Sequence, residues 1–453
     1  MKKSVVFIPL AVVLIGGYFA FSIFYTNKKI DEFFHHNGGD LYERAGFRWS
    51  LASAKTGLFS GKYETEVFFN EEKILIFEHD VAFGARFNPL KVGSIQTKGK
   101  LIKSDEIPDI TDKEFNLKSS ITLGGIDTDV SIKSDSIGRQ DIYSGEYENL
   151  TWRDAKGRFF ISFGRDELDI KANIPFVKFD GAWDEFVIVE DQKYESHSSK
   201  KETGVWIGDS IIDIGRVEFS GEPISFSLSK LKARMDIFAD KGYTLKNVNK
   251  ISFDDFKYSN IDSAQKLWLS DIVFNINLEN LDTNSMRKIY EAISSIDLTN
   301  EAQANLVLLS LFAYTSDILA KQPKIVLEEL SGKYSNQSCK ISGFVQYTGD
   351  GDLQKVYTSL DKDIVAEVDF EVAQKALKEY FRADIYKYYY GYDPEDEIQF
   401  REDVESEVAL NVQEFEDEFD IKADKGIYKG TLEFKDGGYL LDGRPYEPAG
   451  YDF

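Results

Sequence analysis

One stretch near the start of the chain limits most strongly what this protein can be. Residues Ser4–Asn27 contain no charged side chain, and they are flanked by four lysines, Lys2, Lys3, Lys28 and Lys29. As a helix, these 24 residues would be roughly 36 Å long, enough to cross a hydrocarbon core of about 30 Å. The pattern predicts a transmembrane anchor.

A cleaved signal peptide and a buried core helix are the alternatives to an anchor. Signal peptides have an apolar run of about 7–15 residues followed by a small-x-small cleavage site. Here the run is longer and ends among aromatic residues that include Tyr25. Aromatic side chains at the end of a span are typical of the headgroup region of a bilayer. We therefore expect an uncleaved anchor that leaves the membrane near Tyr25 and Lys28.

Charge bears on orientation and on partners. Two lysines stand on each side of the stretch, so the positive-inside rule does not decide the orientation. The chain has 54 Lys and Arg against 78 Asp and Glu, a net charge of −24. Long domains translocate largely regardless of charge, so we expect a cytoplasmic N-terminus and an exported body. The negative charge excludes nucleic acid and anionic headgroups as partners of the whole surface.

The body begins with a region of predicted strands. After a polar stalk at residues 28–47, residues 48–281 contain apolar residues that alternate with polar ones in short runs, as in half-buried antiparallel strands. Gly124-Gly125 favours a tight hairpin. The predicted strands are Glu64–Phe69, Lys73–Phe77, Val81–Phe83, Ser120–Leu123, Asp127–Ile132, Phe159–Phe163, Phe176–Phe179, Val187–Glu190, Ile211–Phe219, Ile224–Leu228, Leu231–Phe238 and Ile272–Leu278.

These strands predict an α+β fold that is mostly β, with a large antiparallel meandering or curled sheet. A helical segment is expected at residues 282–322, where Asp282, Thr283 and Asn284 offer N-cap side chains before a helix over Met286–Ile293. The following run Ala302–Ser316 has no charge, but it is too short to span a bilayer. The segment Ala302–Ala320 that contains it is interpreted as a helix buried against the sheet, as the lining of a lipid groove, or as a helix that touches the membrane. The groove candidates are Leu306, Leu309, Phe312 and Ile318.

Residues 323–453 form a predicted mixed α/β region. The pattern indicates strands at Lys340–Thr348 and Ile364–Phe370 and helices at Val372–Tyr390 and Phe400–Phe415. A β-hairpin is expected at the end, with Gly426–Phe434 as its first strand.

A search for chemistry yields no catalytic residue, metal site or cofactor. Gly208-Asp209-Ser210 matches a hydrolase nucleophile block, but every histidine precedes Ser210, whereas that chemistry usually uses a later one. His79, between Glu78 and Asp80, is interpreted as a strand-end residue. Cys339 is the only cysteine, which excludes intrachain disulfides and zinc sites of the Cys₄ or Cys₂His₂ type.

Several short motifs resemble the YdgA-like family of bacterial envelope proteins. They are Tyr25–Ile30, Thr56–Lys62, Val81–Pro89, Gly93–Thr97 and Asp436–Pro445. The resemblance implies a single-pass protein of the bacterial inner membrane with a periplasmic body. The family often has His-Gly-Pro where this chain has Phe83-Gly84-Ala85, so catalysis by a histidine is not expected at that position.

Three functions follow as hypotheses. The first is a non-catalytic, membrane-anchored envelope protein that binds an apolar or lipid ligand or scaffolds another envelope protein. The second is an envelope hydrolase that uses a pair of carboxylates. The third is a structural protein that self-associates; the sequence leaves its oligomeric state open.

Overall fold

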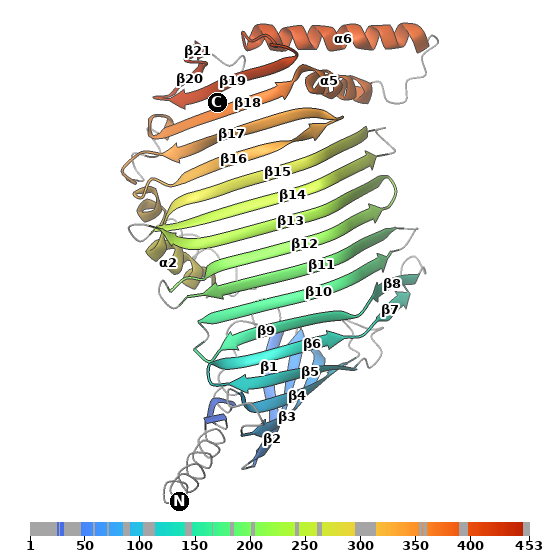
Figure 1. Ribbon diagram of the computed structural model, residues 1–453, viewed down its shortest axis with the longest axis vertical. Coiled ribbons are helices and arrows are strands. Elements are labelled where there is room, and N and C mark those ends of the chain that lie inside the picture. Colours follow the sequence, from blue (N-terminus) through green and yellow to red (C-terminus); the bar gives the residue numbers. More distant parts are fainter. Residues whose placement is uncertain are drawn as a thin grey trace, which may run out of the picture. The chain divides into compact units, whose positions relative to one another are not determined.

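The computed structural model describes residues 25–26, 28–30, 47–57, 59–69, 72–84, 91–102, 114–140, 147–164, 166–181, 185–200, 204–240, 244–260, 265–294, 314–352, 356, 360–388 and 397–446. The protein is mostly β, with a large open antiparallel sheet and few helices (Figure 1). The chain divides into two compact units, each described by itself below. Unit 1 comprises residues 1–177, 194–204 and 291–308, and unit 2 comprises residues 178–193, 205–290 and 309–453. The predicted mostly β, antiparallel fold is confirmed.

Unit 1 is built from antiparallel strands that pair in the order β1-β2-β3-β4-β5-β6-β9-β10, with the hairpin β7–β8 inserted along the chain between β6 and β9. The strands are β1 Phe47–Thr56, β2 Ser60–Phe69, β3 Glu72–Phe83, β4 Lys91–Leu101, β5 Glu114–Thr122, β6 Gly125–Ile132, β7 Asp135–Gln140, β8 Tyr147–Trp152 and β9 Ala155–Ser162. β10 Glu167–Asp180 and β11 Phe186–Ser199 are divided between the two units.

The core of unit 1 lies on one face of these strands. Its buried side chains are Ile30, Tyr63, Val81, Phe83, Val92, Ile95, Ile121 and Ile126. The predicted hairpin at Gly124-Gly125 is confirmed, because Ile121 of β5 pairs with Ile126 of β6.

One strand prediction in unit 1 is wrong. Lys73–Phe77 and Val81–Phe83 are not two strands but parts of β3. The polar run Glu78-His79-Asp80 interrupts the apolar pattern, yet Glu78 and Asp80 are exposed while His79 points into the core. His79 therefore lies in the middle of a strand, not at a strand end.

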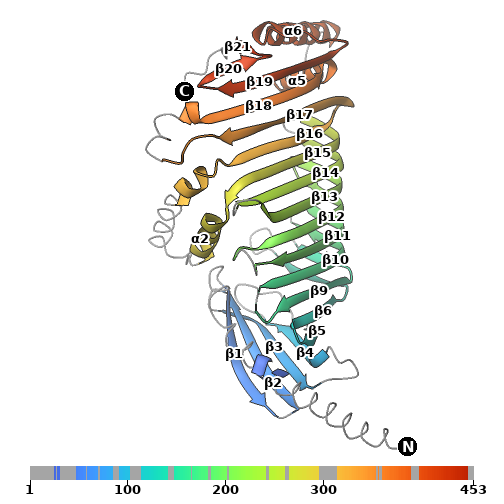
Figure 2. The same ribbon diagram turned by 60° about the vertical axis from the view of Figure 1, so that its left-hand side comes forward.

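Unit 2 contains a meander in which each strand pairs with the next. Its strands are β12 Ile207–Ser220, β13 Ile224–Asp240, β14 Thr244–Asn260, β15 Gln265–Asp282, β16 Lys324–Tyr334, β17 Gln337–Tyr347, β18 Ile364–Ala373, β19 Ile427–Lys435, β20 Gly438–Leu441 and β21 Arg444–Tyr446. Figure 2 shows β12 to β18 following one another in a single layer. The C-terminal hairpin prediction is confirmed by the pairing of β19 with β20.

The strands of unit 2 are longer than predicted. Ile224–Leu228 and Leu231–Phe238 are one strand, β13, of 17 residues. The sequence pattern breaks at Lys230, which has a positive φ of 51°. The backbone kinks there and continues in the same ladder, so a local break in alternation does not end the strand.

Three helices of at least twelve residues are described: α2 Thr283–Ser294, α5 Gln374–Tyr388 and α6 Glu397–Glu418. Of the three candidate caps of α2, the structure selects Asp282, whose carboxylate accepts hydrogen bonds of 2.7 Å from the Ser285 amide and hydroxyl. The helix predicted from Val372 begins only at Gln374, because Val372 still pairs with Tyr428.

The predicted anchor Ser4–Asn27 lies outside the described residues except for Tyr25 and Thr26. Within the described part of the chain, no helix is both long enough and apolar enough to cross a membrane.

Candidate functional site

The candidate site is an apolar face of the unit 2 sheet. The strand register places one apolar residue from each strand between β12 and β18 side by side. Across the sheet, these residues are Ile212, Ala233, Ile251, Phe274, Leu330, Ile341 and Phe370. We call them the apolar row. With neighbouring strands about 4.8 Å apart, the row spans roughly 29 Å.

The apolar row keeps partial contact with solvent. None of its seven members is buried, and Ile212 is 39 % exposed. Among the described residues from Ile207 to Leu330, Leu245 is the only buried apolar side chain. Soluble proteins rarely expose a contiguous apolar surface of this extent unless it binds something.

A line of backbone kinks keeps apolar side chains on this face. Lys230 in β13 and Asp271 in β15 have positive φ angles of 51° and 53°, and Asp254 of β14 lies between them in the register. Side chains three residues apart in a regular strand point to opposite faces. The rings of Phe253 and Phe256 nevertheless lie 6.4 Å apart, so the alternation shifts by one residue at the kink.

An aromatic cluster extends the apolar face beyond the kinks. The Phe226 ring stacks on Phe219, with centroids 5.5 Å apart, and lies 6.3 Å from the Phe256 ring. These phenylalanines are half-buried, like most of the apolar row. The apolar face therefore continues toward the ends of β12 to β14 that carry Phe219, Phe226 and Phe256.

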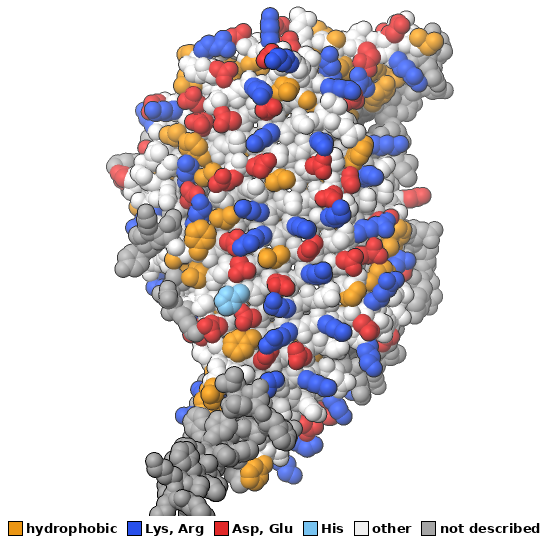
Figure 3. Space-filling view, viewed as in Figure 1, with side chains coloured by type: hydrophobic (Ala, Val, Ile, Leu, Met, Phe, Trp, Pro, Cys, Tyr) orange, Lys and Arg blue, Asp and Glu red, His pale blue; other side chains and the backbone are white. Residues whose placement is uncertain are grey.

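The opposite face of the unit 2 sheet is polar. Figure 3 shows acidic and basic side chains alternating across it. Neighbouring charges pair within the sheet, as in the Lys230–Asp254, Arg234–Asp236 and Lys333–Asp271 ion pairs of 2.6, 2.8 and 2.6 Å. Exposed pairs of this kind contribute little to stability, because solvent and salt screen them. Their main effect is to keep this face hydrated while the other is apolar.

A pocket of about 330 Å³ lies at β15 to β19 of unit 2. Its lining residues are Asp271, Ser331, Gly332, Lys333, Ser338, Cys339, Lys340, Glu371, Ala373 and Ile427. Its two carboxylates are both ion-paired, Asp271 with Lys333 and Glu371 with Lys429. Burial raises the pKa of the Cys339 thiol, which keeps it protonated and a poor nucleophile at neutral pH.

A buried histidine forms the main polar cluster of the unit 1 core. His79 lies 2.8 Å from the hydroxyls of both Thr65 and Thr97, through Nε2 and Nδ1 respectively. Neutral imidazole has one donor and one acceptor nitrogen, so one threonine accepts a hydrogen bond and the other donates one. Burial lowers the pKa of His79 from 6.5 to about 4. Because the His79 ring stays neutral and both of its nitrogens are hydrogen-bonded, it is suited to a structural role in the core rather than to acid–base catalysis.

A family model describes most of the chain. The model of a bacterial protein family of unknown function, DUF945, matches residues 96–449. The chain belongs to this family. The matched residues include every strand of the apolar row, from β12 to β18. Comparison with curated proteins gave no match, and comparison with solved structures gave none either.

The structure describes only part of the predicted site. Of the groove candidates, Leu306, Leu309 and Phe312 lie outside the described residues, as do Lys2 and Lys3. Ile318 is half-buried, and the described residues 314–319 around it are helical. That helix is joined to the loop after β17 by the hydrogen bond of 2.6 Å from the Ser316 hydroxyl to the Gly351 carbonyl.

Sequence reasoning missed the apolar row. Five of its residues belong to predicted strands, whereas Ile251 and Leu330 lie in β14 and β16, which the sequence pattern did not predict. The alternation of the predicted strands is the same whether a second layer covers them or not. One signal was available: the pattern changes phase between Leu228 and Leu231 and again between Leu269 and Ile272. Phase changes that recur in neighbouring strands predict aligned kinks and one continuous face.

Proposed function

We propose that this chain is a membrane-anchored envelope protein that binds lipid acyl chains along the apolar row of unit 2. The observation that carries the proposal is the row itself, seven aligned apolar residues that keep contact with solvent. The row spans roughly 29 Å. One leaflet of a bilayer has a hydrocarbon thickness of roughly 15 Å, so the row is long enough for an acyl chain.

The chemistry of the row favours an acyl chain over a protein partner. Its side chains carry no hydrogen-bond donor or acceptor. Specific protein interfaces combine an apolar centre with polar contacts at the rim, whereas an acyl chain requires only a continuous apolar surface.

The proposal includes anchoring by Ser4–Asn27 in the bacterial inner membrane, with a cytoplasmic N-terminus and a periplasmic body. The uncharged stretch and the aromatic Tyr25 at its end support the anchor. The resemblance to YdgA-like envelope proteins supports the compartment and is compatible with membership of DUF945. A carboxylate-pair hydrolase has less support, because Asp271 and Glu371 in the pocket are each paired with a lysine.

Photo-crosslinking from two adjacent positions tests lipid binding. Phe274 belongs to the apolar row, while its neighbour Asn275 pairs with Lys250 and Glu329 on the polar face. A benzophenone amino acid is placed at either position in the full chain, which is irradiated in cells, purified and analysed by mass spectrometry. We expect lipid adducts at position 274 and several-fold fewer at position 275.

Two results would contradict acyl-chain binding. Equal lipid labelling at both positions would show that the label reports detergent or bulk lipid rather than the apolar row. A protein adduct at position 274 without lipid adducts would favour a scaffold that binds another envelope protein.

A further inference from the structure

The last residues of the predicted anchor are built into the core of unit 1. Thr26 is fully buried, and its hydroxyl donates a hydrogen bond of 2.7 Å to the Val92 carbonyl. A Cβ at Gly93 would lie 2.8 Å from the Thr26 methyl group, so the glycine makes room for this contact. Ile30 is also fully buried. The segment is therefore held in a defined position against the strands.

The same segment touches the tip of the β5–β6 hairpin. The Tyr25 hydroxyl donates a hydrogen bond of 2.5 Å to the carbonyl of Leu123, 98 residues away. The Tyr25 ring also meets Phe163 edge-to-face, at 5.9 Å between centroids. Leu123 thus lies at the level where the predicted span ends.

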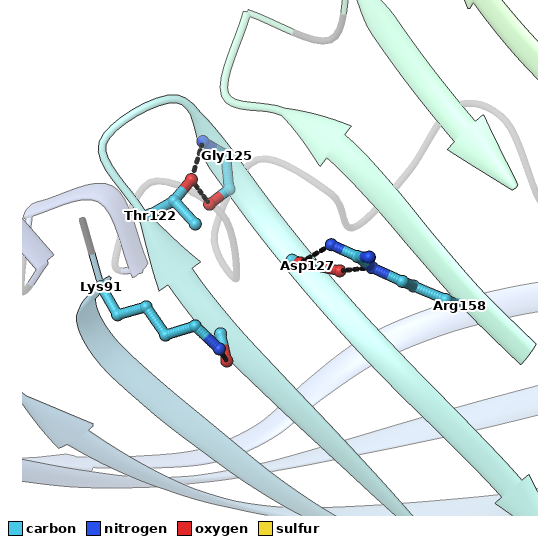
Figure 4. A network of polar contacts seen from close by, with 6 residues as sticks. Lys91, Thr122, Gly125, Asp127 and Arg158 are labelled. Atoms are coloured by element: carbon cyan, nitrogen blue, oxygen red, sulfur yellow. Dashed lines mark hydrogen bonds and ion pairs between the residues drawn. The ribbon is translucent and has the colours of Figure 1, made fainter. Parts of the chain in front are cut away.

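The backbone of the hairpin tip is almost completely hydrogen-bonded. The Thr122 hydroxyl accepts a hydrogen bond from the Gly125 amide and donates one to the Gly125 carbonyl (Figure 4). It also accepts a hydrogen bond from the Gly124 amide. The Gly124 carbonyl accepts from the Phe163 amide at 3.0 Å. The three carbonyls and two of the three amides of residues 123–125 therefore have partners within the protein. A turn in water does not need this, whereas backbone in an apolar environment does.

The side chains around the tip suit a membrane surface. Leu123 is 43 % exposed at the apex. The Lys29 ammonium lies 5.8 Å from the centroid of the Phe163 ring. The Lys91 ammonium on β4 donates a hydrogen bond to the Ser120 hydroxyl on β5. Asp127, the nearest carboxylate along β6, is neutralised by two hydrogen bonds from Arg158 (Figure 4). An apolar apex with lysines beside it is typical of interfacial membrane contact.

From these contacts we infer that the tip of the β5–β6 hairpin inserts Leu123 into the interfacial layer of the membrane. This inference rests on the proposed anchor, because Tyr25 defines the level of the bilayer surface. Unit 1 would then touch the membrane at two points, the anchor and the hairpin tip. Two contacts restrict the tilt of unit 1 against the bilayer more than the anchor alone.

Fluorophores at the hairpin tip and at the far end of β6 test the inference. Leu123 at the tip and Ile132 at the far end are similarly exposed, at 43 % and 39 %, and β6 between them is roughly 24 Å long. Because Cys339 is the only cysteine, Cys339→Ser provides the background for Leu123→Cys or Ile132→Cys. Each variant of the full chain is labelled with nitrobenzoxadiazole in nanodiscs of phosphatidylethanolamine and phosphatidylglycerol.

We expect emission at shorter wavelength from position 123, with quenching by spin-labelled phospholipid several-fold stronger than at position 132. Aqueous emission at position 123, or equal quenching at both positions, would overturn the inference while leaving acyl-chain binding intact. Circular dichroism checks folding, and Leu123→Trp with the same quencher provides a second reporter. A chain that does not enter nanodiscs at all would refute both the anchor and the tip contact.

Discussion

At the scale of single residues, His79 shows how burial sets the properties of a titratable group. Its ring lies between Thr65 and Thr97 on the neighbouring strands and next to the Phe77 ring on its own strand. The two hydroxyls engage the neutral imidazole, while protonation would bury a charge and break the donor–acceptor arrangement. Because the pKa of His79 is lower in the folded chain than in the unfolded chain, protonation of this residue destabilises the fold.

We expect His79 to make unit 1 sensitive to acid. The unfolded chain takes up this proton near pH 6.5, while the folded chain resists protonation down to about pH 4. Stability from the neutral ring is thus complete above pH 6.5 and is lost as the pH falls toward 4, by up to about 3 kcal/mol at 1.36 kcal/mol per pKa unit.

The measurement compares the unfolding midpoints of the wild type and His79→Gln between pH 4 and 7.5. The variant should be less stable at pH 7.5, and its difference from the wild type should shrink as the pH falls. A difference that stays constant with pH would show that folding does not shift the pKa of His79.

At the scale of elements, one tyrosine joins three pieces of the C-terminal region. Tyr428 of β19 is fully buried, and its hydroxyl donates to the Glu416 carboxylate of α6 at 2.6 Å. The same hydroxyl accepts from the Gln374 side chain at the start of α5, at 3.0 Å. Burial, and then the hydrogen bond to Glu416, raise the pKa of Tyr428 to about 12.

Tyr428→Phe should lower the free energy of unfolding by about 2 kcal/mol, because a hydrogen bond to a charged group is lost. Tyr439→Phe, in the adjacent strand β20, is the control and should change it by less than about 0.5 kcal/mol. Denaturant unfolding monitored by circular dichroism measures both. Equal effects of the two substitutions would mean that packing, not the hydroxyl, carries the contribution of Tyr428.

The raised pKa of Tyr428 also predicts how the stability of the fold changes at alkaline pH. Its raised pKa favours the neutral phenol in the folded state, so its contribution is complete below pH 10 and is lost as the pH rises toward 12. Unfolding measured between pH 9 and 12 should show this loss in the wild type and not in Tyr428→Phe.

At the scale of the whole molecule, the proposal requires the body and the anchor to be on defined sides of the membrane. A C-terminal alkaline phosphatase fusion should be active and a green fluorescent protein fusion dark, because the first needs export and the second fails to fold after export through the general secretory route. Deletion of residues 4–27 should reverse both readouts. An active fluorescent fusion on the full chain would place the body in the cytoplasm and contradict the proposed localisation.

The sequence by itself determined the local elements. Alternation identified many of the antiparallel strands, the glycine pair identified the β5–β6 turn, and the run Asp282-Thr283-Asn284 marked the start of α2, because each depends on neighbours within a few residues. The uncharged stretch Ser4–Asn27 likewise predicts an anchor from local composition alone.

Only the tertiary structure decided how these elements combine. Alternating strands can be covered by a second layer or left open, and only the packing of distant residues distinguishes the two, so the open apolar row was not visible in the sequence. The burial of His79 and the bond from Tyr25 to Leu123 have the same origin. Both depend on residues that are far apart in the chain and are brought together by strand register, which local periodicity does not encode.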